Sequence, residues 1–228
     1  MKKYLFTLIL FSISFTSFSQ YRVSVGGSFG SEINMITLGF EREFNVVSKK
    51  IHVNPGLRVN VFNGSSLDFI TAPAEYTVND SEVDTLFMPT VQSNFANLYV
   101  RLGYDITEKL SVSFDIDLVG VSFGSEQNDN VFKPGEDLQS ANTGSSSSVV
   151  ANPTQINVLL VGDNDLGSLN STFMITYNLT KRLGIDAGLT YVFTEYTTDL
   201  SIGYDGNDRF RNKSAMGYFG VSYLLGNK

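Results

Sequence analysis

Long segments of this chain alternate apolar and polar residues with a period of two. Leu183, Ile185 and Leu189 fall in one phase of such a segment, and Asp186 and Thr190 fall in the other. Successive side chains of a β-strand point to opposite faces, so the pattern predicts strands with one apolar and one polar face. We expect eight such strands, over residues 21–30, 34–46, 51–63, 94–105, 109–123, 168–179, 183–200 and 213–225.

The connections between these strands differ sharply in length. Those at 47–50, 106–109 and 180–182 are short and polar, whereas those at 64–93 and 124–167 are long. Short turns at one end and long loops at the other are typical of outer-membrane barrels. The sequence therefore predicts an all-β fold, an eight-stranded antiparallel up-and-down transmembrane β-barrel with short periplasmic turns and long extracellular loops.

Periodicity alone does not say which face of the strands lies inside. A soluble periplasmic ligand-binding barrel would place its apolar face inward. Three features favour apolar side chains outside: a polar face rich in small residues and opposite charges, the long one-sided loops, and aromatic residues near the strand ends. Arg42 is an exception in the apolar phase of the second strand, and we expect it to snorkel toward the interface if it lies near the membrane edge. The aromatic residues near strand ends are Tyr21, Phe44, Tyr104, Tyr177, Tyr191, Phe193 and Tyr223.

The first residues have the features of an export signal. Met1, Lys2 and Lys3 make a short basic start, an apolar run follows over 4–11, and Ser17-Phe-Ser19 provides a small-x-small cleavage site. The apolar run is too short to span a bilayer, which needs about 20 residues. We therefore expect residues 1–19 to be a cleaved signal peptide and 20–228 to form the barrel in the outer membrane.

Charge and cysteine content exclude several other classes. The formal net charge of −7 argues against nucleic acid as a partner. The absence of Cys from the 228 residues excludes a disulfide scaffold and a thiolate metal site.

Two stretches resemble those of a known family. They are the segment 103–117, which reads GYDITEKLSVSFDID, and the last strand, with Tyr218, Gly220, Tyr223 and Leu225 at a spacing that resembles the signal read by the barrel-assembly machinery. The chain resembles small eight-stranded outer-membrane β-barrel proteins of the OmpA/OmpX architecture, in the style found in Bacteroidota. The resemblance implies a monomer that contacts outer-membrane lipid or lipopolysaccharide and is inserted by that machinery. Its C-terminus departs from the commonest form, because Gly226-Asn-Lys228 follow the last strand.

The polar phase predicts a charge network in the lumen. We expect Arg58 to lie near Glu41 and Arg101 to lie near Asp115, each on adjacent strands. Buried charges must be paired or hydrated, and eight strands enclose an interior just wide enough for side chains. We therefore favour a salt-bridged plug over a narrow cation-favouring channel or porin, which five acids against three arginines would also fit. The predicted network is Arg22, Glu41, Glu43, Arg58, Arg101, Asp115, Asp117 and Asp186.

No catalytic residue or cofactor is expected. His52, the one histidine, lies next to a predicted periplasmic turn, and we expect it to be a luminal hydrogen-bonding residue. The G-x-S-x-G matches at 26–30 and 120–124 do not sit between a strand and a helix, as a nucleophile elbow does. We predict that the chain is not an enzyme.

The two long loops are strongly acidic. Asp163-Asn-Asp165 resembles the opening of a calcium loop, but the following Gly comes one residue early and the closing Glu is missing. No metal site is therefore predicted beyond this weak candidate at Asp163 and Asp165. The loops carry Asp68, Glu75, Asp80, Glu82, Asp84, Glu126, Asp129, Glu136, Asp137, Asp163 and Asp165 against Lys133 alone.

Other features of the loops leave alternatives open. Asp84-Thr85-Leu86 is similar to the O-glycosylation site of Bacteroidota, residues 145–148 look like a flexible loop tip, and residues 155–162 could form an extra strand. We expect a structural or surface-interaction role through these acidic extracellular loops.

Overall fold

The computed structural model describes residues 20–48, 50–137, 145–160 and 164–226. The predicted signal peptide lies outside the described residues. Among the residues described, no helix is long and apolar enough to cross a bilayer. The strands are β1 (Gln20–Gly30), β2 (Ile33–Ser48), β3 (Ile51–Thr71), β4 (Thr85–Asp105), β5 (Leu110–Phe123), β6 (Gln127–Lys133), β7 (Ser146–Pro153), β8 (Ile156–Val158), β9 (Leu169–Asn178), β10 (Leu183–Thr198) and β11 (Arg209–Leu225). Three single 3-10 turns, at Ala74–Tyr76, Asp80–Glu82 and Tyr204–Gly206, lie in the connections.

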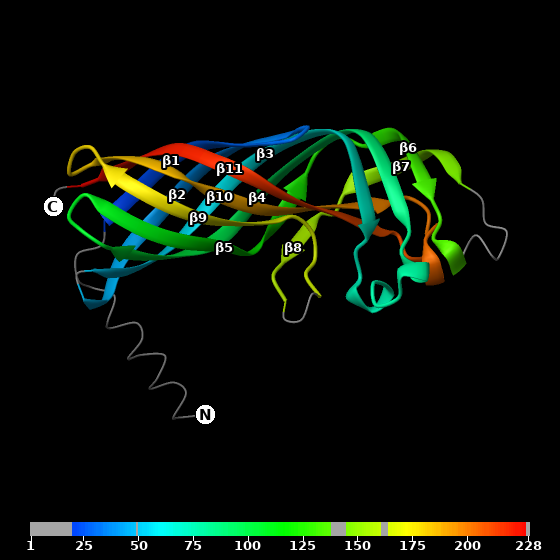
Figure 1. Ribbon diagram of the computed structural model, residues 1–228, viewed down its shortest axis with the longest axis horizontal. Coiled ribbons are helices and arrows are strands. Elements are labelled where there is room, and N and C mark those ends of the chain that lie inside the picture. The colour runs from blue at the N-terminus through cyan, green and yellow to red at the C-terminus, as the bar shows by residue number, and fades with distance from the viewer. Residues whose placement is uncertain (1–19, 49, 138–144, 161–163, 227–228) are drawn as a thin grey trace, which may run out of the picture.

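Eight of the strands hydrogen-bond in a closed ring. The order around it is β1, β2, β3, β4, β5, β9, β10 and β11, and β11 pairs again with β1. Every pairing is antiparallel, which confirms the all-β antiparallel prediction. The short turns and the C-terminal end of β11 lie at the left end in Figure 1, and β6 and β7 lie at the right end. We call these the short-turn end and the distal end.

The count of eight strands is wrong for the chain as a whole, because the described residues form eleven. The expected loop 64–93 is largely the continuation of β3 and β4, which pair as far as Ile70 with Thr85. The expected loop 124–167 contains β6, β7 and the three-residue β8, so residues 156–158 do form an extra strand, which pairs with β5. The prediction of a flexible loop tip at residues 145–148 is also wrong, because β7 begins at Ser146.

These extensions close a second, smaller ring at the distal end. β4 pairs with β6, β6 with β7, β7 with β10, and β11 with β3. Together with the β3–β4 and β10–β11 ladders, these pairings join six strands in a ring. The chain therefore tapers from eight strands to six toward the distal end, and we call this six-stranded part the distal cap.

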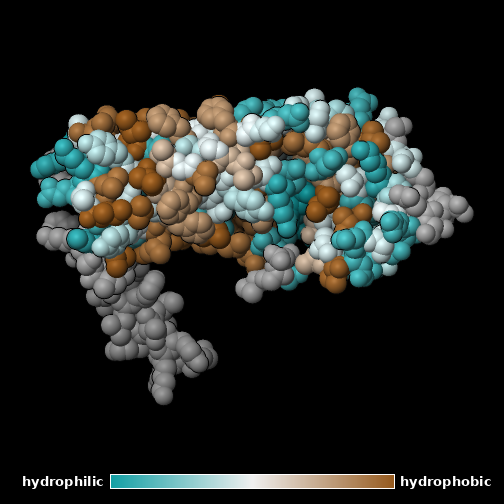
Figure 2. Space-filling view, in the orientation of Figure 1, coloured by the Kyte–Doolittle hydropathy of each residue, from teal (hydrophilic) through white to brown (hydrophobic). Residues whose placement is uncertain are grey.

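The apolar phase of the eight-stranded ring faces outward. Val25, Leu38 and Leu98 remain 51–55% exposed in the middle of their strands, and Leu189 and Phe219 are also exposed. On the face shown in Figure 2, hydrophobic side chains predominate over the half toward the short-turn end, apart from hydrophilic residues at that end itself, and hydrophilic residues are prominent over the distal cap. A water-soluble protein buries most of its large apolar side chains. This ring instead has apolar side chains on its outer face and charged and polar ones in its interior.

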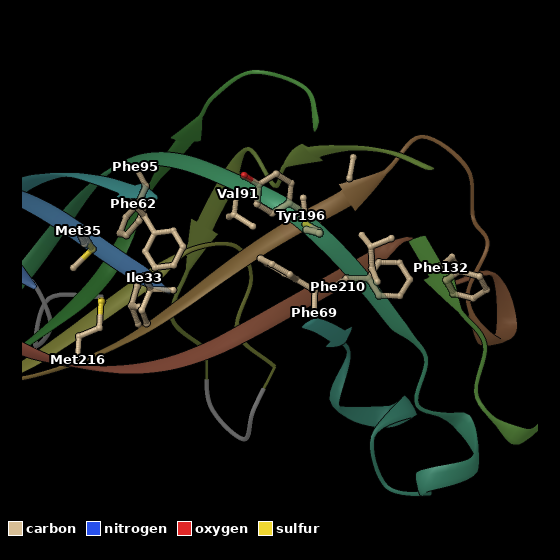
Figure 3. Packing of buried hydrophobic residues seen from close by; sticks show 14 residues of the cluster. Ile33, Met35, Phe62, Phe69, Val91, Phe95, Phe132, Tyr196, Phe210 and Met216 are labelled. Carbon is tan, nitrogen blue, oxygen red and sulfur yellow. The ribbon is translucent and has the colours of Figure 1, made fainter. Parts of the chain in front are cut away.

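A compact hydrophobic core fills the distal part of the interior. It runs from the end of the eight-stranded ring into the distal cap (Figure 3). Phe69 packs edge-on against Tyr196 with ring centroids 5.4 Å apart, and Phe132 against Phe210 at 6.1 Å. The buried members are Ile33, Met35, Phe62, Phe69, Leu86, Met88, Val91, Phe95, Phe132, Ala151, Val192, Tyr196, Phe210 and Met216.

Candidate functional site

The interior of the eight-stranded ring is centred on Arg58 of β3. Its Nη1 lies 2.6 Å from Asp115 Oδ1, and its Nε lies 2.6 Å from Asp117 Oδ1, both on β5. A third donor, Nη2, bonds the backbone oxygen of Asn170 on β9. All three charged side chains are buried. One guanidinium fork therefore joins three strands across the lumen, which is the multidentate geometry that arginine favours.

A second centre lies on Glu41 of β2. Its carboxylate accepts hydrogen bonds from Tyr99 Oη at 2.7 Å and Asn54 Nδ2 at 3.0 Å, and Arg101 Nη1 lies 3.1 Å from it. The guanidinium carbons of Arg58 and Arg101 lie 4.9 and 5.7 Å from the centroid of the Tyr99 ring. Tyr99 thus contacts both guanidinium groups and connects the two centres by cation–π contact and hydrogen bonding.

The remaining predicted network residues also lie inside the ring, with different partners. Arg101 Nη2 lies 3.2 Å from Asp115 Oδ2, and Arg22 lies 3.3 Å from Glu41 and 3.0 Å from Glu43. Asp186 instead accepts hydroxyl hydrogen bonds from Thr176 at 2.6 Å and Ser222 at 3.4 Å. Arg58, expected near Glu41, instead reaches past the neighbouring strand β4 to Asp115 and Asp117 of β5, because its long side chain points into the lumen.

Three residues of this network were missed in the sequence. They are Tyr99, Asn54 and Asn97. Asn97 Nδ2 donates a hydrogen bond to Asp117 Oδ2 at 2.7 Å, and Asn97 Oδ1 accepts one from Asn157 Nδ2 at 2.8 Å. Tyr99 falls between Asn97 and Arg101 in the same strand phase, so its inward position was readable from periodicity. The prediction omits it because the network was sought among charged side chains alone.

The network leaves almost no space at the middle of the ring. The cavity beside Arg58, Tyr99 and Arg101 has a volume of about 10 Å³, no more than one water molecule requires. Toward the short-turn end the lumen widens to about 560 Å³, lined by Arg22, Glu43 and His52 among others. This vestibule is therefore blind, closed on its inner side by the ion pairs and beyond them by the hydrophobic core.

His52 lies in the wall of the vestibule, as its place in the sequence predicted. Its ring is buried, with Nε2 3.7 Å from Asp105 Oδ1, too long for a hydrogen bond. Nδ1 is buried and has no hydrogen-bond partner among the described residues. The expected hydrogen-bonding role is therefore not seen in this part of the chain, where its one charged contact is with Asp105.

A second buried ion cluster lies where β10 and β11 enter the distal cap. Glu195 of β10 is fully buried, with Arg209 Nε 2.8 Å and Arg211 Nη2 2.7 Å from its carboxylate oxygens. Both arginines also donate to the backbone oxygen of Asp165. The sequence prediction missed this cluster because the strand phase changes here: Thr194, Glu195 and Tyr196 are all buried.

The weak calcium candidate is not assembled in the described part of the chain. Asp163 lies outside the described residues, and the buried Asp165 carboxylate accepts the backbone N–H of Leu160 at 2.8 Å. Within the described ranges, no group of three or more His, Cys, Asp or Glu residues is placed to hold a metal ion.

Asp84 is another acidic residue that does not lie on the surface. It is fully buried and accepts the backbone N–H groups of Gly135 at 2.7 Å and Tyr204 at 2.6 Å, tying together three distal connections. Thr85, the expected glycosylation residue, begins β4 between Ile70 of β3 and Lys133 of β6. The flanking Asp84 and Leu86 are fully buried, whereas Thr85 itself is half-buried.

Some of the acidic residues at the distal surface, Glu75, Glu82, Asp137 and Asp205, lie near two tyrosines. Tyr76 and Tyr204 meet edge to face at 5.9 Å, and Tyr76 Oη donates to Asp205 at 3.3 Å. The nearby carboxylates, Glu82 foremost, raise the pKa of Tyr204 because an ionised phenol would face like charge. Partial desolvation and then Asp205 raise the pKa of Tyr76. The tip of the cap is therefore an anionic, aromatic surface.

No protein-family model and no curated protein matches the sequence. Several solved structures are similar over most of their length. The attachment invasion locus protein Ail of Yersinia pestis is 13% identical with a TM-score of 0.36, covering 91% of this chain and 95% of that one. Neisserial surface protein A is 11% identical with a TM-score of 0.37, over 90% and 94% of the two chains. A major outer membrane protein of Thermus thermophilus is 11% identical with a TM-score of 0.38, over 91% of this chain and 100% of that chain.

Proposed function

We propose that this chain is an integral outer-membrane β-barrel protein without enzymatic activity, exported by its N-terminal signal. Its eight-stranded ring would lie in the bilayer and its distal cap outside the cell. The observation that carries the proposal is the reversal of the ring: exposed Val, Leu and Phe side chains outside, and ion pairs inside. A hydrocarbon surrounding stabilises that arrangement, whereas water would destabilise it.

The height of the apolar surface supports a bilayer setting. On β10 the outward phase is hydrophobic from Leu183 to Phe193. At roughly 3.3 Å per residue this is roughly 33 Å of strand, or roughly 25 Å along the axis for a tilt of roughly 40°. The apolar band of outer-membrane barrels has about this height. Closure of the ring also leaves no unpaired edge facing lipid along the paired strands.

The interior favours a closed barrel over the narrow channel that the acid excess also suggested. A channel needs a continuous polar path, and two separate obstructions oppose one here. The first is the ion-pair network at Arg58 and Glu41, and the second is the core of Phe and Met side chains beyond it. We infer a structural or surface-interaction role, in which the rigid cap presents its acidic, tyrosine-bearing tip to partners outside the cell.

One substitution separates this proposal from a soluble ligand-binding barrel. Leu38 lies opposite Val25 and Val59, near mid-height of the apolar surface, and is 55% exposed. In lipid vesicles, Leu38→Arg should lower the unfolding free energy by about 2–4 kcal/mol, because the charge meets hydrocarbon. On a soluble protein an exposed site would change by about 0.5 kcal/mol or less.

Val78→Arg provides the matched control, since Val78 is 78% exposed at the cap and should face water in either case. Its expected effect is about 0.5 kcal/mol or less. Folding would be followed by the electrophoretic shift between boiled and unboiled samples. Equal stability of the two variants in vesicles, or a chain that leaves membranes on carbonate washing, would contradict the proposal.

A further inference from the structure

A charged residue lies in the apolar outer face of the ring near the short-turn end. Arg42 of β2 occupies the outward phase and pairs in register with Tyr21 of β1. Its chain neighbours Glu41 and Glu43 point into the lumen, where they contact Arg22. Arg42 is thus on the opposite side of the strand from the lumen charges, among outward-facing aromatic residues.

Aromatic rings hold the Arg42 guanidinium in place. Its central carbon lies 4.8 Å from the centroid of the Phe44 ring and 5.9 Å from that of the Tyr21 ring. Tyr21 in turn stacks on Phe40, with centroids 5.4 Å apart and an interplanar angle of 16°. These are cation–π distances, and they restrict the guanidinium to a narrow region of the surface.

The part of the chain that the structure describes does not neutralise this charge. Among the described residues no carboxylate makes an ion pair with Arg42, and its buried Nε has no hydrogen-bond partner. An unpaired cation beside hydrocarbon is costly, so a partner from the surroundings would stabilise it. Arg22 at this end is paired in the lumen, and other cations of the described residues here are exposed in or beside the short turns, namely Lys50, Lys109, Lys181 and Arg182.

We propose that Arg42, Tyr21 and Phe44 form a binding site for the phosphate of a phospholipid in the periplasmic leaflet. The inference rests on the proposed function, which puts the short-turn end on the periplasmic side. A guanidinium offers several N–H donors in one plane and matches the oxygens of a phosphate diester. Aromatic rings near the headgroup level anchor the same region. The exposed faces of Tyr21, Phe40 and Leu38 continue from the site toward the bilayer centre and would contact an acyl chain.

The test measures lipid binding to the refolded, detergent-solubilised protein by native mass spectrometry. Dioleoylphosphatidylglycerol supplies the phosphate and dioleoylglycerol serves as the lipid without phosphate. Arg42→Gln should weaken the first phosphatidylglycerol binding step by about tenfold and leave dioleoylglycerol binding unchanged. Arg42→Lys should lose part of the affinity, because it keeps the charge without the planar donors. Lys109→Gln removes the same charge from a turn at the same end and should change affinity by about twofold or less.

The outcomes distinguish the two proposals. If Arg42→Gln folds, as its gel shift would show, yet binds phosphatidylglycerol as the parent does, the phosphate site is wrong while the barrel stands. Equal binding of the two lipids by the parent would also overturn the site. Lipid A competing through Arg42 more strongly than phosphatidylglycerol would contradict the leaflet assignment. A parent chain that neither inserts into vesicles nor shows a gel shift would instead overturn the proposed function.

Discussion

Replacing Arg58 with alanine should lower the free energy of unfolding by about 3–5 kcal/mol. The substitution leaves Asp115 and Asp117 buried without their shared cation, and the backbone oxygen of Asn170 loses a donor. The cost is dominated by these stranded carboxylates rather than by the strength of the original pair. Because the chain has no Trp, unfolding in urea would be followed by far-UV circular dichroism and by the gel shift.

Two further variants make the expectation specific. Arg58→Lys should fall between the parent and Arg58→Ala, since one ammonium cannot donate toward both carboxylates and the Asn170 oxygen in the observed geometry. Lys181→Ala removes an exposed cation from a short turn and should change stability by about 0.5 kcal/mol or less. An Arg58→Ala protein that unfolds at the same urea concentration as Lys181→Ala would show that the network does not stabilise the ring.

The second large effect is expected in the distal cap. Phe210 is fully buried, packs against Phe132 and lies where β11 pairs with β3. Phe210→Ala should lower the stability of the cap by about 3–5 kcal/mol, through lost burial and the cavity left behind. Hydrogen exchange should then accelerate in β6, β7 and the start of β11. The amides of β1 and of the part of β4 that pairs with β5 should keep their protection.

Leu200→Ala is the control for this experiment. Leu200 is 71% exposed in the connection between β10 and β11, so its truncation creates no cavity. Its exchange pattern should match that of the parent. If Phe210→Ala accelerated exchange evenly through both rings, the cap and the eight-stranded ring would be one cooperative unit, contrary to the two-part architecture.

The eight-stranded ring follows closely from the sequence, because a two-residue repeat is visible wherever one face differs from the other. β1, β5, β9 and the first part of β10 each keep one phase of polar side chains and one of apolar ones over most of their length. The same repeat brings Arg101 and Asp115 directly opposite each other in register.

The distal cap could not be found in this way. Its strands are interrupted by residues with positive φ that are not glycine, namely Ser66 at 54°, Asp129 at 65° and Ser148 at 60°. Such residues break the alternation without the glycine that usually signals a turn. The inward phase also becomes apolar toward the cap, at Phe62 before Ser66 as well as at Phe69 and Leu86, so a single rule for inside and outside fails partway along β3 and β4.

The partners within the network were also beyond sequence reasoning. Periodicity states which side of a strand a charge occupies, but the choice of partner depends on the width of the ring and on side-chain reach. Arg58 crosses to β5, where a bulge between the pairs Leu98–Val119 and Tyr99–Asp117 sets the position of Asp117. No glycine or proline stands at Leu118 or directly beside it, and Gly120 two residues later does not by itself mark the position of the bulge.

A closed lumen is tested most directly by the conductance of the purified protein in a planar bilayer, with incorporation verified independently. We expect a silent trace, because the ion pairs at Arg58 and the hydrophobic core of the cap close the lumen in series. Arg58→Ala should be silent as well, since the core remains in that variant. Discrete conductance steps from verified, folded parent protein, altered by Arg58→Ala, would contradict the closed barrel and make the lumen an ion pathway.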